Sequence, residues 1–195
     1  CAGGFDFTNY RNNPDNKYSI SSDLVYKTIE DKYGNIWVAT YGGGVNVVKR
    51  EKDGRCLFLN RNNVMKRYPV DAYLKVRTVA LDKYGRVWAG SSDGILVMSY
   101  FNNKVKIQVV GDNEDELDNL QSKDVVCLAC AHNGQMWVGT NGGGLSRCDD
   151  YGQGVYVFDT FGSEDGLPSE EIKSITFDER GNVWFATDHI LCSFD

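Results

Sequence analysis

The stretch Asp31-Lys-Tyr-Gly-Asn-Ile-Trp-Val-Ala-Thr40 decides the fold, because three similar stretches follow it along the same chain. They are Asp82-Lys-Tyr-Gly-Arg-Val-Trp-Ala-Gly-Ser91, Ala131-His-Asn-Gly-Gln-Met-Trp-Val-Gly-Thr140 and Asp178-Glu-Arg-Gly-Asn-Val-Trp-Phe-Ala-Thr187. Self-similarity at a steady period is the sequence signature of a repeat architecture. The chain is therefore interpreted as four copies of one structural unit.

Every tryptophan of the chain falls in this frame, with successive spacings of 51, 49 and 47 residues. Each tryptophan stands three residues after a glycine that is also shared by all copies. The tryptophans are Trp37, Trp88, Trp137 and Trp184, and the glycines are Gly34, Gly85, Gly134 and Gly181. These eight residues are predicted to be the structural framework of the repeat.

Each copy has the pattern of a β-hairpin. A run with period-2 character precedes each glycine, and the tryptophan run follows it. The Asp-x-x-Gly loop suits a type I turn closed by a left-handed glycine, since the aspartate can accept turn amides and glycine tolerates a positive φ. Asp31, Asp82 and Asp178 are therefore predicted to be turn residues and not a catalytic set. Ala131 replaces the aspartate in the third copy, where Asn133 keeps a turn signal.

The tryptophan strand is apolar on both faces, and a small residue follows each tryptophan two positions later: Ala39, Gly90, Gly139 and Ala186. A strand buried on both faces belongs to a sheet that lies between two others. Small sheets stacked around an axis satisfy this requirement, whereas an open sandwich leaves one face polar. The prediction is an all-β fold, a β-propeller with four blades of four antiparallel strands in one partial domain over residues 1–195.

The N-terminal residues 5–8 lie at the distance from Trp37 that is expected of an orphan outer strand. This strand either completes the last blade and closes a four-bladed ring, or belongs to a larger ring of which the chain is a slice. We favour the slice. Its exposed blade faces predict self-association.

Composition excludes several classes of function. The chain has 195 residues and a formal net charge of −6, which disfavours binding to nucleic acid. No apolar run reaches the roughly 20 residues of a membrane span, so direct membrane insertion is not expected. The six cysteines do not recur at one repeat position, so no disulfide framework, metal site or cofactor is predicted. Buried thiols are expected instead, with Cys127 and Cys130 on opposite strand faces.

Candidate ligand contacts lie in the loops at one rim of the propeller, because sites usually form among loops on a rigid scaffold. Aromatic and amide groups there suit stacking on a sugar. The candidates are Tyr41, Arg67, Tyr68, Tyr73, Asp93, Asn141, Asp188 and His189. Catalysis is not expected, because His132 and His189 stand in different copies and turns. A protein-interaction scaffold and a propeller hydrolase or lyase with paired carboxylates remain alternatives.

The string Asp-x-x-Gly-Asn-(Ile/Val)-Trp-(Val/Phe)-(Ala/Gly)-Thr resembles the two-component regulator propeller repeat, as does the lead-in Asp165-Gly-Leu-Pro-Ser-Glu-Glu-Ile-Lys-Ser-Ile175. The resemblance covers about residues 5–195 and departs at Ala131 and near Asp188. It implies a slice of a larger propeller of the seven-bladed type. It also implies the extracytoplasmic, periplasmic sensor region of a hybrid two-component sensor kinase, and many such kinases respond to carbohydrates. The expected function is non-catalytic ligand recognition, with an oligosaccharide as the expected partner.

Overall fold

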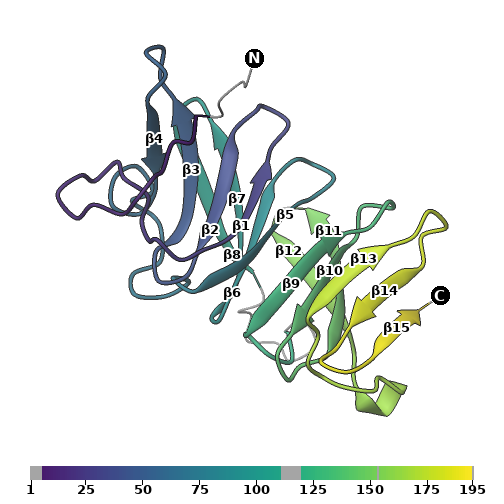
Figure 1. Ribbon diagram of the computed structural model, residues 1–195. Coiled ribbons are helices and arrows are strands. Elements are labelled where there is room, and N and C mark those ends of the chain that lie inside the picture. Colours follow the sequence, from purple (N-terminus) through teal and green to yellow (C-terminus); the bar gives the residue numbers. More distant parts are fainter. Residues whose placement is uncertain (1–5, 111–119, 153, 195) are drawn as a thin grey trace, which may run out of the picture.

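A computed structural model describes residues 6–110, 120–152 and 154–194. These residues form four antiparallel sheets that follow one another in chain order (Figure 1). Each sheet corresponds to one copy of the sequence repeat and is called a blade here. The tryptophan frame therefore predicted the all-β fold and the number of blades correctly.

Within each blade the strands are ordered as they occur in the chain. Blade 1 contains β1 (Val25–Glu30), β2 (Ile36–Thr40), β3 (Gly44–Arg50) and β4 (Cys56–Leu59). Blade 2 contains β5 (Val76–Leu81), β6 (Val87–Ser91), β7 (Gly94–Phe101) and β8 (Lys104–Val110). Blade 3 contains β9 (Val125–Cys130), β10 (Met136–Thr140), β11 (Leu145–Gly152) and β12 (Val155–Phe161).

Blade 4 has three strands in the described residues, β13 (Ser174–Phe177), β14 (Val183–Ala186) and β15 (Leu191–Phe194). The fourth strand that the repeat pattern predicts for the first three copies is present in blades 1, 2 and 3. One turn of 3-10 helix, η2 (Ser163–Asp165), precedes it. The four tryptophans lie in β2, β6, β10 and β14, the second strand of each blade.

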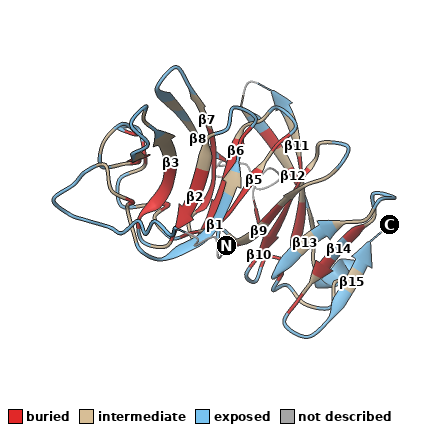
Figure 2. Ribbon diagram, turned by 45° about the horizontal axis from the view of Figure 1, so that its top comes forward, coloured by how far each residue is buried: buried red, intermediate tan, exposed pale blue. Residues whose placement is uncertain are grey.

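The blades stand side by side around their first strands. Strand β1 contacts β5, β5 contacts β9, and β9 contacts β13. Blade 1 and blade 4 lie at opposite ends of the row in both views (Figures 1 and 2). The described chain is thus an open row of blades and not a closed four-bladed ring.

The N-terminal segment does not form the orphan outer strand that the spacing predicted. Phe5 lies outside the described residues, and residues 6–8 have no strand structure. Further along, the ring of Tyr10 packs edge-on against Phe58 of β4, with centroids 5.3 Å apart. Ile20 lies in one apolar cluster with Val38 and Phe58. This segment therefore covers the outward face of blade 1 and does not extend blade 4.

The tryptophans join each blade to the next one. Trp37 lies in one apolar cluster with Val79 and Met98 of blade 2, and Trp88 lies in a cluster with Leu128 of blade 3. Trp137 likewise packs with Phe185 of blade 4. These three side chains are 0%, 1% and 4% exposed, so each fills the space between two neighbouring sheets as a wedge. Figure 2 shows the buried residues concentrated in these facing surfaces.

The small residues after the tryptophans allow this close approach. A Cβ atom on Gly90 would lie 2.5 Å from Cγ1 of Val125 in the next blade. A Cβ atom on Gly139 would lie 2.6 Å from Cγ2 of Ile172. The blade interface therefore requires a small residue two positions after the tryptophan. A side chain at either glycine would push the neighbouring blade away.

Trp184 differs from the other three because no described blade lies beyond blade 4. Its side chain is 37% exposed. Leu191, on the same face of this blade, is 68% exposed. Blade 4 therefore presents one open apolar face, while the outward face of blade 1 is covered by the N-terminal segment.

The aspartate that recurs in blades 1, 2 and 4 closes the hairpin turn and also binds the tryptophan. Asp31 accepts hydrogen bonds from the backbone N–H groups of Tyr33 and Asn35 at 2.9 and 3.0 Å, and from Nε1 of Trp37 at 2.9 Å. Asp82 and Asp178 make the equivalent indole bonds at 3.1 and 3.2 Å. The glycine of each turn has a positive φ, between 77° and 90°. The prediction that these aspartates are turn residues is confirmed, and the indole bond is an addition to it.

Blade 3 lacks this arrangement because Ala131 occupies the aspartate position. Among the described residues, no acceptor is found for the indole N–H of Trp137. We expect Ala131→Asp to raise the free energy of unfolding by about 1 kcal/mol, the usual net value of an added hydrogen bond. Urea denaturation would measure it. His132→Asp, an exposed neighbour with the same new carboxylate, is the control, and an equal gain there would contradict the explanation.

The described cysteines are all free thiols. Cys127 lies in the cluster between blades 3 and 4, and Cys130 packs against the cluster between blades 2 and 3. The prediction that they occupy opposite faces is confirmed. Burial raises the pKa of Cys127 to about 12, which keeps it in the unreactive thiol form at neutral pH.

Candidate functional site

The first strands of blades 1, 2 and 3 each contain a β-bulge near the beginning. The pairing register shifts between Val25 and Lys27 and between Val76 and Thr78, which leaves Tyr26 and Arg77 in the bulges. Blade 3 has the same shift, and Val126 occupies its bulge. Bulges redirect a side chain and are frequent near functional sites. The bulged residues belong to the innermost strands, at the rim where each blade begins.

Bridges between neighbouring blades lie beside the bulges. The turn residue Tyr41 of blade 1 pairs with Lys75 of blade 2, and Asn141 of blade 3 pairs with Glu171 of blade 4. Each bridge places the turn after a tryptophan strand against the start of the next inner strand. We call this set the inner rim: Tyr26, Tyr41, Lys75, Arg77, Asp124, Asn141, Glu171, Lys173 and Asp188.

An aromatic pair with two cations forms the first part of the inner rim. The rings of Tyr26 and Tyr41 stack with centroids 5.6 Å apart and an interplanar angle of 25°. Nζ of Lys75 lies 5.8 Å from the centroid of Tyr41, and Cζ of Arg77 lies 5.9 Å from it. Tyr26 is exposed, so an aromatic surface with adjacent hydrogen-bond donors faces solvent.

A charged pair continues the inner rim from blade 2 to blade 3. The guanidinium of Arg77 donates a hydrogen bond to Asp124, and Asn141 donates to the other carboxylate oxygen at 3.1 Å. Burial opposes the charged form of Arg77. The hydrogen bond and the charge of Asp124 outweigh this effect, so the pKa of Arg77 is raised. Arg77 is therefore held in place from both sides, by Tyr41 and by Asp124.

In blade 4 the inner rim is a cluster of two carboxylates around one lysine. Nζ of Lys173 lies 3.1 Å from Glu171 and 3.4 Å from Asp188. The pKa of Asp188 is lowered, first by a hydrogen bond with Glu171 and then by Lys173. All three side chains are substantially exposed. This part of the rim offers both acceptors and a donor to a polar ligand.

Three of the predicted site residues lie together in the inner rim, namely Tyr41, Asn141 and Asp188. His189 follows Asp188 in the exposed turn before β15, where its backbone N–H donates to Thr187 at 3.4 Å. Together with His189, these three residues lie in the turns after the tryptophan strands, as their place in the repeat predicts.

The other four predicted residues lie in or beside the long loop between blades 1 and 2. Tyr68 and Tyr73 are buried, and the hydroxyl of Tyr68 donates to the carbonyl of Tyr73 at 2.6 Å. Asp93 accepts the backbone N–H of Tyr73 at 2.9 Å. Burial raises the pKa of Tyr68. These three residues fix the loop, while Arg67 points into a groove at the outer edge of blade 2.

Sequence reasoning missed Tyr26, Lys75, Arg77, Asp124, Glu171 and Lys173 because it searched the turns and not the strands. A signal was present. Tyr26 and Arg77 are large side chains with polar groups at the second position of the first strand of their blades, which conflicts with packing between two sheets. A bulge resolves the conflict by turning such a side chain out of the sheet.

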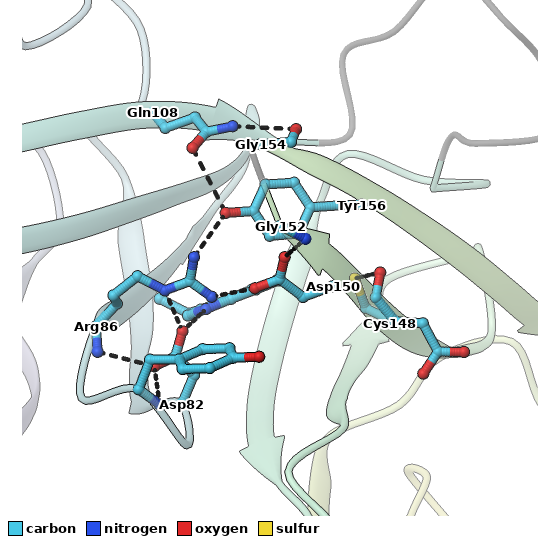
Figure 3. A network of polar contacts seen from close by, with 11 residues as sticks. Asp82, Arg86, Gln108, Cys148, Asp150, Gly152, Gly154 and Tyr156 are labelled. Atoms are coloured by element: carbon cyan, nitrogen blue, oxygen red, sulfur yellow. Dashed lines mark hydrogen bonds and ion pairs between the residues drawn. The ribbon is translucent and has the colours of Figure 1, made fainter.

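A second polar network joins blades 2 and 3 at the opposite rim (Figure 3). Arg86 lies between Asp82 of its own blade, at 2.6 Å, and Asp150 of blade 3. The guanidinium also donates to the hydroxyl of Tyr156 at 3.3 Å, and Gln108 donates to the carbonyl of Gly154 at 3.2 Å. Arg86 pairs with a carboxylate of each blade, so this network holds blades 2 and 3 together.

Within residues 6–110, 120–152 and 154–194, no three or more His, Cys, Asp or Glu side chains are grouped so that they could hold a metal ion. In the same residues no helix is long and apolar enough to cross a membrane.

Comparison with protein families gives three matches to one repeat family. The family described as two component regulator propeller matches residues 19–42, 119–142 and 166–189. These segments cover the hairpins of blades 1, 3 and 4. Blade 2 is not matched. A comparison with curated protein sequences finds no match.

Solved structures with the same fold have several different functions. The extracellular domain of the hybrid two component system BT3049 from B. thetaiotaomicron is 25% identical over 91% of this chain, with a TM-score of 0.67. PorZ of Porphyromonas gingivalis, a surface component of the type-IX secretion system, is 21% identical over 89%, with a TM-score of 0.68. Virginiamycin B lyase from Staphylococcus aureus is 16% identical over 88%, with a TM-score of 0.54.

The chain spans 22%, 26% and 55% of the lengths of these three proteins. The two matches below 25% identity show the fold alone. The repeat family, the tryptophan frame and the row of blades agree with one another. The chain is a β-propeller segment, and three of its four blades contain a match to the two component regulator propeller repeat.

Proposed function

We propose that this chain is a non-catalytic, extracytoplasmic part of a hybrid two-component signalling protein and recognises a carbohydrate at its inner rim. The observation that carries the proposal is the stacked pair Tyr26 and Tyr41 with Lys75 and Arg77 around it. The repeat family and the likeness to the extracellular domain of a hybrid two component system support the signalling context.

The chemistry of the inner rim favours a sugar over other small ligands. A pyranose ring has an apolar face that stacks on an aromatic ring and a periphery of hydroxyl groups that exchange hydrogen bonds. The inner rim supplies the aromatic surface at Tyr26, donors at Lys75 and Asn141, and acceptors at Glu171 and Asp188. A chain of several sugar units could contact more than one blade.

The way the rim is built links ligand binding to the arrangement of blades. Tyr41 of blade 1 contacts Arg77 of blade 2, and Arg77 binds Asp124 of blade 3. A ligand that bridges these residues stabilises the blades against separation. At a free concentration of 100 times Kd, this linkage is worth about 2.7 kcal/mol. Such a stabilised arrangement is a signal that domains elsewhere in a sensor can detect.

We expect Tyr41→Ala to weaken carbohydrate binding by about tenfold or more, because truncating a central aromatic contact costs above ~1 kcal/mol. A glycan screen by thermal shift followed by calorimetry on the chain would provide the measurement. Tyr151→Ala is the matched control, because Tyr151 is an exposed tyrosine in β11, away from the rim. Binding that survives Tyr41→Ala unchanged, or a screen without any binder beside a proven protein ligand, would reject the proposal.

A protein-interaction scaffold is the second candidate, favoured by the open face of blade 4. Trp184 and Leu191 are exposed there, and this face supports self-association of the chain. Light scattering would detect it as a mass that rises with concentration. The positions of His132 and His189, in turns at opposite ends of their blades, support a non-catalytic role over the hydrolase or lyase alternative.

A further inference from the structure

We propose that the outer edge of blade 2 binds an extended acidic peptide, which adds a strand to β8. In the part of the chain that the structure describes, β8 pairs with β7 and no strand pairs with its other edge. The backbone N–H and C=O groups of such an edge form a template for another chain. Peptides that add a strand to a sheet edge are a recurring mode of recognition.

A groove of about 700 Å³ follows this edge. Five consecutive residues of β8, at positions 104–108, line it. Side chains of a strand alternate between its two faces, so a hollow confined to one face would be lined by every second residue only. The groove therefore runs along β8 and extends onto β7, where residues 97–99 also line it.

The charge of the groove selects the kind of peptide. Lys66, Arg67, Lys104 and Lys106 line it, and all four are exposed. None of the four has a carboxylate partner among the described residues, in contrast to the paired Arg77 and Arg86. They form a positive patch on a chain whose net charge is −6. Complementary charge across an interface favours a matching partner and increases its association rate.

The groove also offers apolar contacts at alternate positions. Val105 and Ile107 alternate with Lys104 and Lys106 along β8, and Val64 lies on the groove wall. A peptide that alternates acidic and apolar residues would place its carboxylates near the lysines and its apolar side chains near these aliphatic residues. The geometry thus specifies both the backbone conformation and the residue pattern of the ligand.

Blade 1 shows within the same chain how such an edge is covered. The backbone N–H of Phe58 in β4 donates to the carbonyl of Tyr18 at 2.9 Å. Asn63 and Asn60 donate to the carbonyls of Lys17 and Ser19 at 2.6 and 3.1 Å. The turn at residues 17–19 of the N-terminal region therefore lies beside the outer strand of blade 1 and the loop that follows it. The corresponding strand of blade 2 has no such cover in the described residues.

Lysines on an edge strand also discourage pairing with other proteins, so their presence alone predicts protection of the edge. An acidic partner reverses this effect, because its carboxylates turn the repulsion into attraction. The two roles are compatible. The lysines would exclude most strands and admit an acidic one, and selectivity by repulsion of wrong partners is a common device.

The test uses fluorescence anisotropy with a labelled octapeptide that alternates glutamate and valine, added to the chain at low salt. We expect binding that Lys104→Glu with Lys106→Glu weakens at least tenfold. The control is Lys52→Glu with Arg180→Glu, which makes the same charge change at two exposed positions away from the groove. Two N-methylated versions of the peptide, one at the odd and one at the even residues, test for backbone pairing, and at least one should not bind.

Each other result would overturn the proposal. Equal loss of binding in the two double variants would show a general charge effect. If both N-methylated peptides bound as tightly as the unmethylated peptide, the binding would be charge attraction without an added strand. Binding of a sulfated hexasaccharide at this groove with no binding of the peptide would assign it to an anionic glycan. Failure of the carbohydrate screen at the inner rim would leave this test unaffected, because the two sites share no residue.

Discussion

Replacing Trp88 by alanine is expected to lower the free energy of unfolding by about 3–5 kcal/mol, the range for removing a fully buried tryptophan. Trp88 is 1% exposed and packs with Leu128 and Val138 of the next blade. Its indole also donates to Asp82 at 3.1 Å. The substitution removes apolar contacts on both sides of the blade 2 and blade 3 interface, and leaves a cavity that the rigid sheets cannot fill.

The same substitution at Trp184 is the matched comparison. Trp184 makes the equivalent bond to Asp178 at 3.2 Å but is 37% exposed. We expect a loss below about 2 kcal/mol, because much of the ring already contacts water. Urea denaturation of both variants measures the difference. Equal losses at the two positions would contradict the wedge role of the buried tryptophans.

Arg86→Met is expected to destabilise the chain by about 3 kcal/mol, the lower end of the range for breaking a buried ion pair. Arg86 is the cation of the network in Figure 3, with side-chain exposures of 28% for Arg86, 3% for Asp82 and 12% for Asp150. The variant leaves two poorly hydrated carboxylates without their counter-charge. Methionine preserves most of the packing of the side chain, so the loss reports mainly the charge.

A double-mutant cycle with Asp150→Asn separates the bond between blades from the bond within the turn. We expect a coupling of at least ~1 kcal/mol between Arg86 and Asp150. Burial opposes the charge of Arg86, yet the two aspartates outweigh it and its pKa is raised. Arg55→Met is the control, because Arg55 pairs with Asp53 in an exposed turn at 2.6 Å. Losses of similar size at Arg55 and Arg86 would contradict the role assigned to this network.

The features that repeat could be predicted from the sequence, because four copies reinforce one another. The tryptophans, the turn glycines and the small residues gave the blade and its packing. The features that occur once could not. Arg86 occupies the position of Asn35 and Asn182, which bind only their own turn aspartate. Nothing in the sequence shows that the longer arginine side chain also reaches Asp150 of the next blade.

Only three of the nine residues of the inner rim were predicted, for a similar physical reason. Tyr41, Asn141 and Asp188 were expected because turns after the tryptophan strand are visible in the sequence. Tyr26 and Arg77 depend on a bulge that changes the side-chain direction, and a regular period-2 pattern assigns them to the wrong face. The exposure of Trp184 also depends on its neighbour, since its own sequence surroundings match those of the buried Trp37.

The inner rim and the groove at the outer edge of blade 2 both depend on blades that stand side by side with a tryptophan wedged in each interface. Hydrogen exchange of the four indole N–H groups, followed by NMR at concentrations where light scattering reports a monomer, tests this directly. We expect Trp37 and Trp88, buried and bound to aspartate, to exchange far more slowly than Trp184. Four indoles exchanging at one fast rate would show that the tryptophans lie in water and that the blades do not pack in this order.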